Sequence, residues 1–115
     1  MSSSCLFCKI ISGEIPGKKV FEDEQVVVIE DIAPAAPCHL LILPRKHLSG
    51  LLELNEADDK LVGHIHRVAA QIAREKGFAD RGFRVVVNTN ADAGQTVFHL
   101  HFHLLAGRNL TWPPG

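Results

Sequence analysis

The segment Phe98-His99-Leu100-His101-Phe102-His103-Leu104-Leu105 decides how this chain is interpreted, because imidazole and apolar side chains alternate along it. In a β-strand, expected here over 97–105, successive side chains point to opposite faces, so all three histidines should share one face. Neighbouring imidazoles would then lie about 7 Å apart. Such a face suits a solvent-exposed polar strand, a zinc site shared by two histidines, or phosphorus chemistry, in which neutral imidazole is a nucleophile.

The residues just before this segment favour phosphorus chemistry. Gly94-Gln95-Thr96 supplies a flexible turn, an amide and a hydroxyl, which are groups suited to binding phosphate oxygens. Asn88, on the preceding predicted strand, adds a further amide. Together these residues predict a donor-rich pocket beside the imidazoles.

The whole chain, residues 1–115, is expected to form a single α+β domain. Further strands are indicated by apolar alternation and β-branched runs at 20–21, 26–29, 39–43 and 83–89, the first two as a hairpin. Helical spacing of apolar residues indicates a short helix over 5–12 and a main helix from the N-cap Asn55 to the vicinity of Gly77. This order predicts an antiparallel sheet of about five strands, packed by the main helix and the short N-terminal helix.

Composition argues against several classes of function. The formal net charge is −1 and the 12 Lys and Arg residues are spread along the chain, so the basic surface of a nucleic-acid-binding protein is not expected. No apolar run approaches the roughly 20 residues of a membrane span, and residues 1–5 are too short and polar for a signal peptide. We therefore expect a cytoplasmic protein without membrane or nucleic-acid partners.

Three cysteines carry a separate signal. Cys5 and Cys8 do not resemble a secreted disulfide framework, and in a reducing compartment their spacing suggests metal or redox chemistry. Such a pair supplies half of a tetrahedral zinc site. Cys38 is expected to fill the core as a small apolar residue.

The histidine segment and the Gly94-Gln95-Thr96 turn before it resemble the signature of the histidine-triad (HIT) family. The similarity extends over nearly the whole chain, through Lys9-Ile10-Ile11, Glu14-Ile15-Pro16, Phe21-Glu22-Asp23, Asp31-Ile32, Pro37, His39, Pro44 and His47. The ending Trp112-Pro113-Pro114-Gly115 is similar to that of the nucleoside-phosphoramidase branch, the histidine-triad nucleotide-binding (Hint) proteins. The resemblance implies a HIT-like fold and a homodimer.

The resemblance also implies an activity. His101 would attack the α-phosphorus of a purine nucleoside 5′-phosphoramidate, such as adenosine 5′-phosphoramidate, and water would then cleave the nucleotidyl-histidine. The catalytic set would comprise His99, His101, His103 and His39, of which His39 orients its neighbours. The implied residues around the phosphate, ribose and base of the nucleotide are Gly94, Gln95, Thr96, His101, His103, Asp31, Asn88 and Ile32.

A structural zinc ion is the implied cofactor. Some bacterial HIT proteins hold zinc through a cysteine pair and two histidines, one in a Pro-x-x-His segment and the other the first of the triad. The corresponding residues here are Cys5, Cys8, His47 and His99. The alternative is a reduced cysteine pair that packs without metal. If zinc binds, it would fix His99 structurally and leave His101 free to react.

Other functions remain open from the sequence. The nearest enzymatic alternative is a dinucleoside polyphosphate hydrolase, a HIT branch that also has a Gln-Thr-Val segment before its histidines. A nucleotide-binding regulator with vestigial hydrolysis and a zinc-storage or sensor protein belong to other classes. The Trp-Pro-Pro-Gly ending favours the phosphoramidase, and Trp112 is expected to help shape the leaving-group pocket of the neighbouring subunit.

Overall fold

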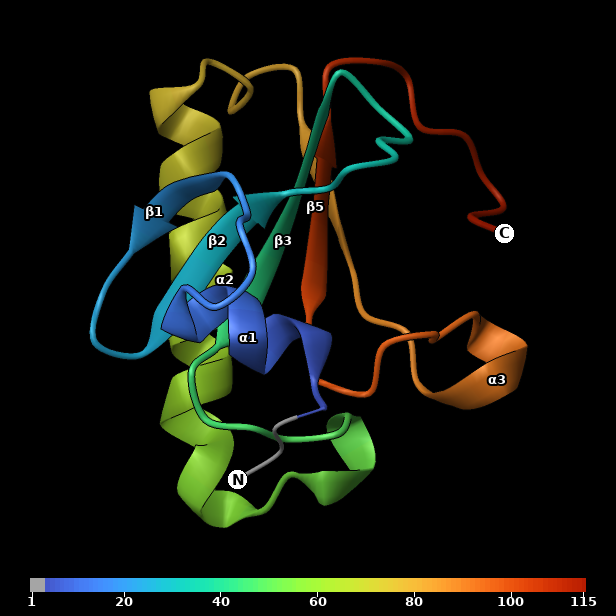
Figure 1. Ribbon diagram of the computed structural model, residues 1–115. Coiled ribbons are helices and arrows are strands. Elements are labelled where there is room, and N and C mark those ends of the chain that lie inside the picture. The colour runs from blue at the N-terminus through green and yellow to red at the C-terminus, as the bar shows by residue number, and fades with distance from the viewer. Residues whose placement is uncertain (1–3) are drawn as a thin grey trace.

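A five-stranded antiparallel sheet forms the centre of the computed structural model, which describes residues 4–115 (Figure 1). The strands lie in the order β1-β2-β3-β5-β4, so β1 and β4 are the two edges. Their bounds are β1 Lys19–Glu22, β2 Val26–Glu30, β3 Cys38–Pro44, β4 Phe83–Val86 and β5 Phe102–Ala106. The helical elements are α1 Leu6–Ser12, η1 Leu51–Glu53, η2 Glu56–Asp58, α2 Asp59–Glu75 and α3 Asn90–Ala93. The predicted α+β class and antiparallel sheet are confirmed.

Both faces of the central strands are covered, which explains why β2 and β3 are almost continuously apolar. On one face Val26, Val28 and Ile42 join the core cluster that includes the buried residues of α2. On the other face Val27, Ile29 and Leu43 pack in a second cluster with residues of α1. Figure 1 shows α1 and α2 on opposite sides of the sheet. Side chains that alternate along a strand therefore alternate between the two helices.

The main helix begins later than the sequence predicts. Asn55 is a cap, since its Oδ1 accepts from the N–H of Ala57 at 2.9 Å, but it caps the 3-10 turn η2 and not α2 itself. The apolar stripe predicted for the helix is confirmed by the buried residues Leu61, Ile65, Val68 and Ile72. Cys38 is also buried in this core, as predicted.

The predicted strand over 97–105 is wrong in its first half, because β5 begins only at Phe102. The backbone before it pairs with a loop: Leu100 donates its N–H to the carbonyl of Leu48 at 2.6 Å. The predicted strand over 83–89 is likewise shorter, and a short helix, α3, lies in the loop that follows. The histidine segment therefore does not present one flat face. No helix within residues 4–115 is long and apolar enough to cross a membrane.

Candidate active site and thiol cluster

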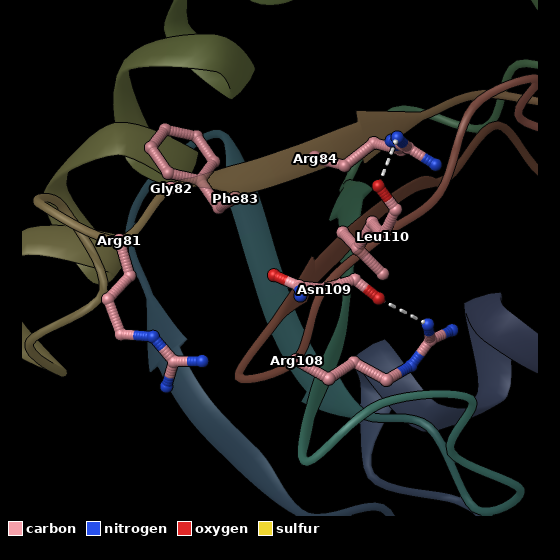
Figure 2. Close-up of a pocket in the computed structure, with 7 residues that line it drawn as sticks. All are labelled: Arg81, Gly82, Phe83, Arg84, Arg108, Asn109 and Leu110. Carbon is pink, nitrogen blue, oxygen red and sulfur yellow. Dashed lines mark hydrogen bonds between the residues drawn. The ribbon is translucent and has the colours of Figure 1, made fainter.

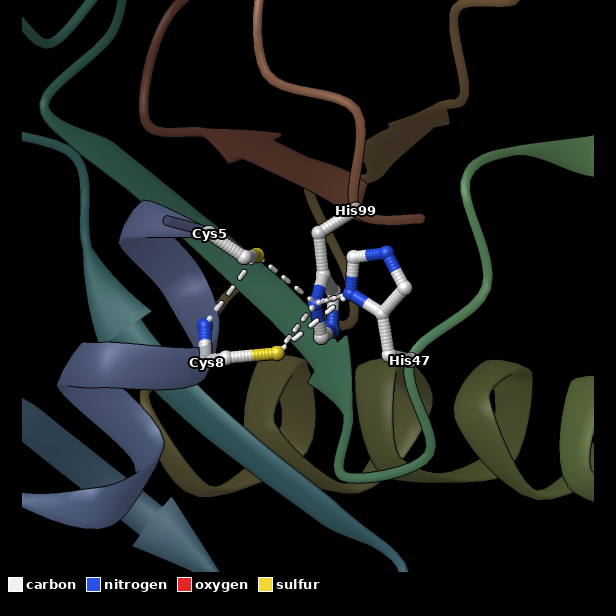
Figure 3. A group of neighbouring side chains, drawn as sticks. All are labelled: Cys5, Cys8, His47 and His99. Carbon is white, nitrogen blue, oxygen red and sulfur yellow. Dashed lines mark hydrogen bonds between the residues drawn. The ribbon is translucent and has the colours of Figure 1, made fainter. Parts of the chain in front are cut away.

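The three histidines of the segment point into two different groups of side chains. Cys5, Cys8, His47 and His99 converge into one group, here called the thiol cluster (Figure 3). Asp31, His39 and His103 converge into a second group, here called the imidazole chain. His101 lies beside the imidazole chain, with its ring centroid 5.1 Å from that of His103.

The thiol cluster brings together three separate parts of the chain. Both cysteines come from the start of α1, His47 comes from the loop after β3, and His99 comes from the segment before β5 (Figure 3). Nδ1 of His99 lies 3.4 Å from the Cys5 sulfur, 3.5 Å from the Cys8 sulfur and 3.1 Å from Nδ1 of His47. The Cys8 sulfur is 3.3 Å from Nδ1 of His47.

A backbone carbonyl fixes which nitrogen of His99 faces the thiols. Nε2 of His99 lies 2.8 Å from the carbonyl oxygen of Pro44. A carbonyl only accepts, so Nε2 carries the proton and Nδ1 presents a lone pair to the cluster. His99 is fully buried, and this burial lowers its pKa, which favours the neutral imidazole that can ligate a metal.

These residues fit a zinc ion. A tetrahedral site with Zn–S near 2.3 Å and Zn–N near 2.1 Å has sulfur–nitrogen edges of about 3.6 Å and nitrogen–nitrogen edges of about 3.4 Å. The separations of 3.3 to 3.5 Å and of 3.1 Å are close to these edges, and all four donor atoms lie within 4.8 Å of one another. The carbonyl on Nε2 of His99 is the kind of outer partner that orients metal-ligating histidines.

In the imidazole chain, a backbone N–H sets the positions of the protons. The N–H of Ala35 donates to Nδ1 of His39 at 2.9 Å, so the proton of His39 is on Nε2. This Nε2 lies 2.9 Å from Nδ1 of His103 and 3.4 Å from Oδ2 of Asp31. His39 therefore donates to Nδ1 of His103, which leaves the proton of neutral His103 on its Nε2.

His103 is held in the neutral state. Burial lowers its pKa to about 4, together with the positive charges that His101 and His39 would carry. The Asp31 carboxylate opposes this shift only in part. At neutral pH, His103 is consequently a neutral hydrogen-bond donor through Nε2.

His101 has the opposite arrangement of its two nitrogens. Its Nδ1 lies 2.7 Å from the carbonyl oxygen of His99, so Nδ1 carries the proton and Nε2 of the neutral ring has a free lone pair. A phosphate placed between His101 and His103 would meet a nucleophilic nitrogen from one ring and an N–H donor from the other.

Comparison with known proteins identifies the family of this chain. Residues 4–111 match the family model described as scavenger mRNA decapping enzyme C-term binding. An uncharacterized HIT-like protein of Synechococcus elongatus is 44% identical over 115 residues, which cover 100% of both chains. The chain belongs to the HIT family.

Solved HIT structures show the same fold. The crystal structure of a HIT family hydrolase from Legionella pneumophila superimposes with a TM-score of 0.96 at 47% identity, covering 97% of this chain and 100% of that one. The histidine triad nucleotide-binding protein from Candida albicans gives a TM-score of 0.82 at 33% identity, covering 96% of this chain and 83% of that one. The HIT-like fold expected from the histidine signature is thus confirmed.

The residues expected to bind the nucleotide differ in burial and in hydrogen bonding, and not all of them are free to contact a phosphate. Gln95 is 6% exposed, and its side chain is bonded to the backbone: its Oε1 accepts from Asn90, and its Nε2 donates to Ser49 and Val97. It therefore holds the loop around α3 in shape. Gly94 is left-handed, with φ of 91°, and ends α3.

The other expected nucleotide residues lie nearer the surface. Thr96 is exposed, Asn88 is half-buried and the Ile32 side chain is fully exposed. Asp31 is half-buried at the start of a turn, where its Oδ1 accepts from the N–H of Ala33 at 2.8 Å. Of these residues, Asp31 is itself a member of the imidazole chain, through its contact with Nε2 of His39 at 3.4 Å.

The C-terminal tail is fixed to the body by arginines. A cavity of about 250 Å³ lies between the start of β4 and the segment after β5, and its lining residues are drawn in Figure 2. On one side of it Arg84 donates to the carbonyls of Leu110 at 3.2 Å and Thr111 at 3.0 Å. Arg108 donates to the carbonyl of Ala35 at 3.0 Å, which ties the segment after β5 to the loop before β3, and also to the carbonyl of its neighbour Asn109 at 2.9 Å. Trp112, which follows, is 81% exposed.

Several determinants of the site are absent from the sequence prediction. The carbonyls of Pro44 and His99 and the N–H of Ala35 assign the imidazole protons, but backbone groups carry no sequence signal. Phe7, in contrast, had a possible signal, since it lies between the two cysteines in the sequence. Its ring packs against the rings of both His99 and His101.

Proposed function

We propose that this HIT protein is a nucleotide-binding hydrolase that cleaves purine nucleoside 5′-phosphoramidates through a nucleotidyl-histidine. One observation carries the proposal: His101 presents an unprotonated Nε2 beside a neutral His103, with ring centroids 5.1 Å apart. Nucleophile and donor are thereby separated onto two rings, His101 by the carbonyl of His99 and His103 by the side chain of His39. The names of the hydrolase from Legionella pneumophila and of the nucleotide-binding protein from Candida albicans support this direction.

The first step is attack by Nε2 of His101 on the α-phosphorus. A nitrogen–phosphorus bond forms to His101, and the bond between phosphorus and the amine breaks. The amine leaves with the electron pair of that bond and takes up a proton from water, because neutral His103 donates a hydrogen bond and carries no imidazolium proton to transfer. The hydrogen bond from Nδ1 of His101 to the carbonyl of His99 stabilises the positive charge that the ring gains during attack.

His103, together with His39 and Asp31, provides a hydrogen-bond donor to the phosphate. Nε2–H of His103 donates to a phosphoryl oxygen or to the departing nitrogen, both of which become more basic in the transition state. His39 holds His103 in this tautomer, and Asp31 shares the proton of His39. In the second step, water attacks phosphorus, the bond to His101 breaks, and the nucleoside monophosphate is released.

Nucleotide binding is assigned to the surface around this pair of rings. Asp31 and Asn88 are proposed for the ribose and Ile32 for the base, as the HIT resemblance implies. Thr96 and the backbone of the Gly94 turn are proposed for the phosphate. Gln95 supports this turn through its three backbone bonds.

We further propose that Cys5, Cys8, His47 and His99 hold a structural zinc ion. When bound there, zinc would cross-link α1, the loop after β3 and the segment before β5. His99 then contributes to catalysis through its carbonyl, which orients His101, and not through its ring. All three cysteines are free thiols in the structure, which suits the reducing cytoplasm proposed for this protein.

Steady-state kinetics on adenosine 5′-phosphoramidate, measured beside diadenosine polyphosphates, tests the activity. We expect a kcat/KM at least about tenfold higher for the phosphoramidate, a difference of about 1.4 kcal/mol in barrier. The reverse preference would assign the chain to the dinucleoside polyphosphate hydrolases. Nucleotide binding without turnover of either substrate would indicate a regulator.

A homodimer is proposed as the working assembly. The edge strand β4 is unpaired on one side in the described chain, and the exposed Trp112 lies on the tail beyond it. Because arginines fix the tail up to Thr111, Trp112 is presented in a defined place, suited to the leaving-group pocket of a second subunit.

Deletion of residues 110–115 tests the role of the tail. We expect a folded dimer whose kcat/KM changes unequally across phosphoramidates that differ in the amine, because contacts to the leaving group are lost along with the two bonds from Arg84 to the tail. The control is Arg81→Ala, which alters the same cavity and leaves the tail bonds of Arg84 and Arg108 in place. A uniform change across the substrates would make Trp112 a packing residue.

A further inference from the structure

Phe7 joins the thiol cluster to the nucleophilic ring. It lies between Cys5 and Cys8 on α1 and is 5% exposed. Its ring centroid is 5.0 Å from that of His101, at an interplanar angle of 79°, and 6.0 Å from that of His99, at 81°. Both contacts have the edge-to-face geometry that aromatic pairs prefer.

His101 needs such a contact because its hydrogen bond restrains only part of the ring. The bond to the carbonyl of His99 fixes Nδ1, but the outer side-chain torsion of histidine is broad, so the ring plane can still tilt about this point. The lone pair of Nε2 lies in the ring plane. A tilt therefore moves the lone pair away from the phosphorus and lengthens the approach.

We propose that Phe7 is a positioning residue that sets the plane of the His101 imidazole for attack, and that the thiol cluster holds Phe7 in place. The inference rests on the nucleophilic role of His101 proposed above. α1 has only seven residues, and at its N-terminal end the thiols of Cys5 and Cys8 meet His99. The contacts of Cys5 and Cys8 with His99, two residues before Phe7 and one residue after it, limit the movement of its ring.

The test compares Phe7→Leu with Ile10→Ala. Ile10 is a matched control, because it lies on the same helix and in the same buried cluster, with 8% exposure. We expect Phe7→Leu to lower the single-turnover rate at saturating adenosine 5′-phosphoramidate by at least about tenfold, with the Kd for AMP changed by less than about threefold. Ile10→Ala should lower the urea midpoint without slowing the single turnover.

Two outcomes would overturn the assignment of Phe7. If Phe7→Leu raises the Kd for AMP and leaves the saturated rate unchanged, Phe7 is a binding residue. If both variants lose stability and neither loses rate, Phe7 is a core residue only. NMR of the His101 ring gives a readout independent of turnover: its signals should shift or broaden in Phe7→Leu and stay as in the wild type in Ile10→Ala.

The link to the thiol cluster is tested with Cys8→Ser. This variant should slow single turnover, and the double variant with Phe7→Leu should be no slower than Phe7→Leu alone within about threefold, since both act through one ring. Fully additive losses would overturn the link. Failure of the proposed function looks different, because the wild type itself would then not turn over the phosphoramidate, while the NMR comparison would still test the contact.

Discussion

The thiol cluster and the imidazole chain use the same residue type for opposite purposes. In the thiol cluster, the carbonyl of Pro44 accepts a hydrogen bond from Nε2–H of His99, so the lone pair of Nδ1 faces two sulfurs. In the imidazole chain, the N–H of Ala35 occupies Nδ1 of His39 and turns an Nε2–H toward His103. The thiol cluster therefore directs lone pairs toward one point, as a bound cation requires. In the imidazole chain, each hydrogen bond sets the tautomer of the next ring, from Ala35 through His39 to His103.

This difference shows that backbone hydrogen bonds determine which nitrogen of each histidine carries the proton, and therefore what each ring can do chemically. His99 and His101 are two positions apart, yet His99 presents Nδ1 as a lone pair and His101 presents Nε2. Each assignment follows from one carbonyl contact, that of Pro44 for His99 and that of His99 for His101. The change from loop to strand at Phe102 makes them possible, because a regular strand would have sent both rings to one face.

The largest effect is expected at the nucleophile. His101→Asn should lower kcat on adenosine 5′-phosphoramidate by at least about a hundredfold, about 2.7 kcal/mol in barrier, because no covalent intermediate can form. The fold and the Kd for AMP should change little, and zinc content should stay the same because the thiol cluster is intact. A variant that retains more than about a tenth of the wild-type kcat would exclude His101 as nucleophile.

The second prediction concerns metal content. Protein purified without chelator should contain one zinc per chain, and Cys5→Ser combined with Cys8→Ser should contain essentially none, as measured by elemental analysis. The third cysteine supplies the control: Cys38→Ser removes a buried thiol outside the cluster and should leave zinc unchanged. If the wild-type protein contains no zinc, the cysteine pair only packs in the core, and the thiol cluster no longer differs from the imidazole chain by binding a metal.

The outline of the fold could be predicted from the sequence because its signals are local. Apolar runs predicted β2 and β3, and helical spacing predicted the buried stripe of α2. The start of β5 could not be predicted in this way. Imidazole and apolar side chains alternate from residue 98 to residue 104, while the backbone in the first half of this segment bonds to a loop far away in the sequence.

In the candidate site too, some features could be predicted from the sequence and others could not. Chemistry-bearing residues such as His39 and the four members of the thiol cluster could be assembled from the HIT resemblance. Their tautomers could not be assigned, since these depend on Pro44, Ala35 and His99 backbone groups. The side-chain bonds of Gln95 were also missed, because a buried amide and a phosphate-binding amide look alike in a sequence.

The third prediction uses the lowered pKa of His103. Its pKa of about 4 in the folded chain lies below the ordinary value of 6.5, so between these pH values the unfolded chain binds more protons. The stability that depends on neutral His103 is therefore complete above about pH 6.5 and is lost as the pH falls toward 4. Urea unfolding followed from pH 7.5 to 4.5 should show this loss.

His103→Gln is the matched variant for the pH dependence. Glutamine keeps a donor and does not titrate, so the slope of stability against pH should become shallower by up to about one proton. An unchanged slope in His103→Gln would mean that His103 is not held neutral, and the proposed direction of the imidazole chain would fail.

The smallest effect is expected at a histidine outside both groups. Nε2 of His64, on α2, lies 2.7 Å from Oδ2 of Asp23, and Oδ1 of Asp23 accepts from the N–H groups of Gln25 and Val26 in the turn between β1 and β2. Burial acts to raise the pKa of Asp23, but these bonds outweigh it and lower the pKa below the ordinary value. The stability that depends on this carboxylate is present above about pH 4 and is lost as the pH falls through its lowered pKa.

Replacement of His64 tests whether a histidine that is paired only with a carboxylate, here Asp23, affects zinc binding or catalysis. Both side chains of the pair are about 30% exposed, so His64→Ala should cost only about 0.2–1 kcal/mol in urea unfolding at pH 7. Asp23→Ala should cost more, about 1–2 kcal/mol, because two turn N–H groups also lose their acceptor. Neither variant should alter zinc content, since no residue of the pair contacts the thiol cluster. A decrease in zinc content or kcat of more than about twofold in His64→Ala would mean that α2 affects the geometry of the histidine segment. The backbone contacts at Pro44, His99 and Ala35 would then not be enough to explain how the thiol cluster differs from the imidazole chain.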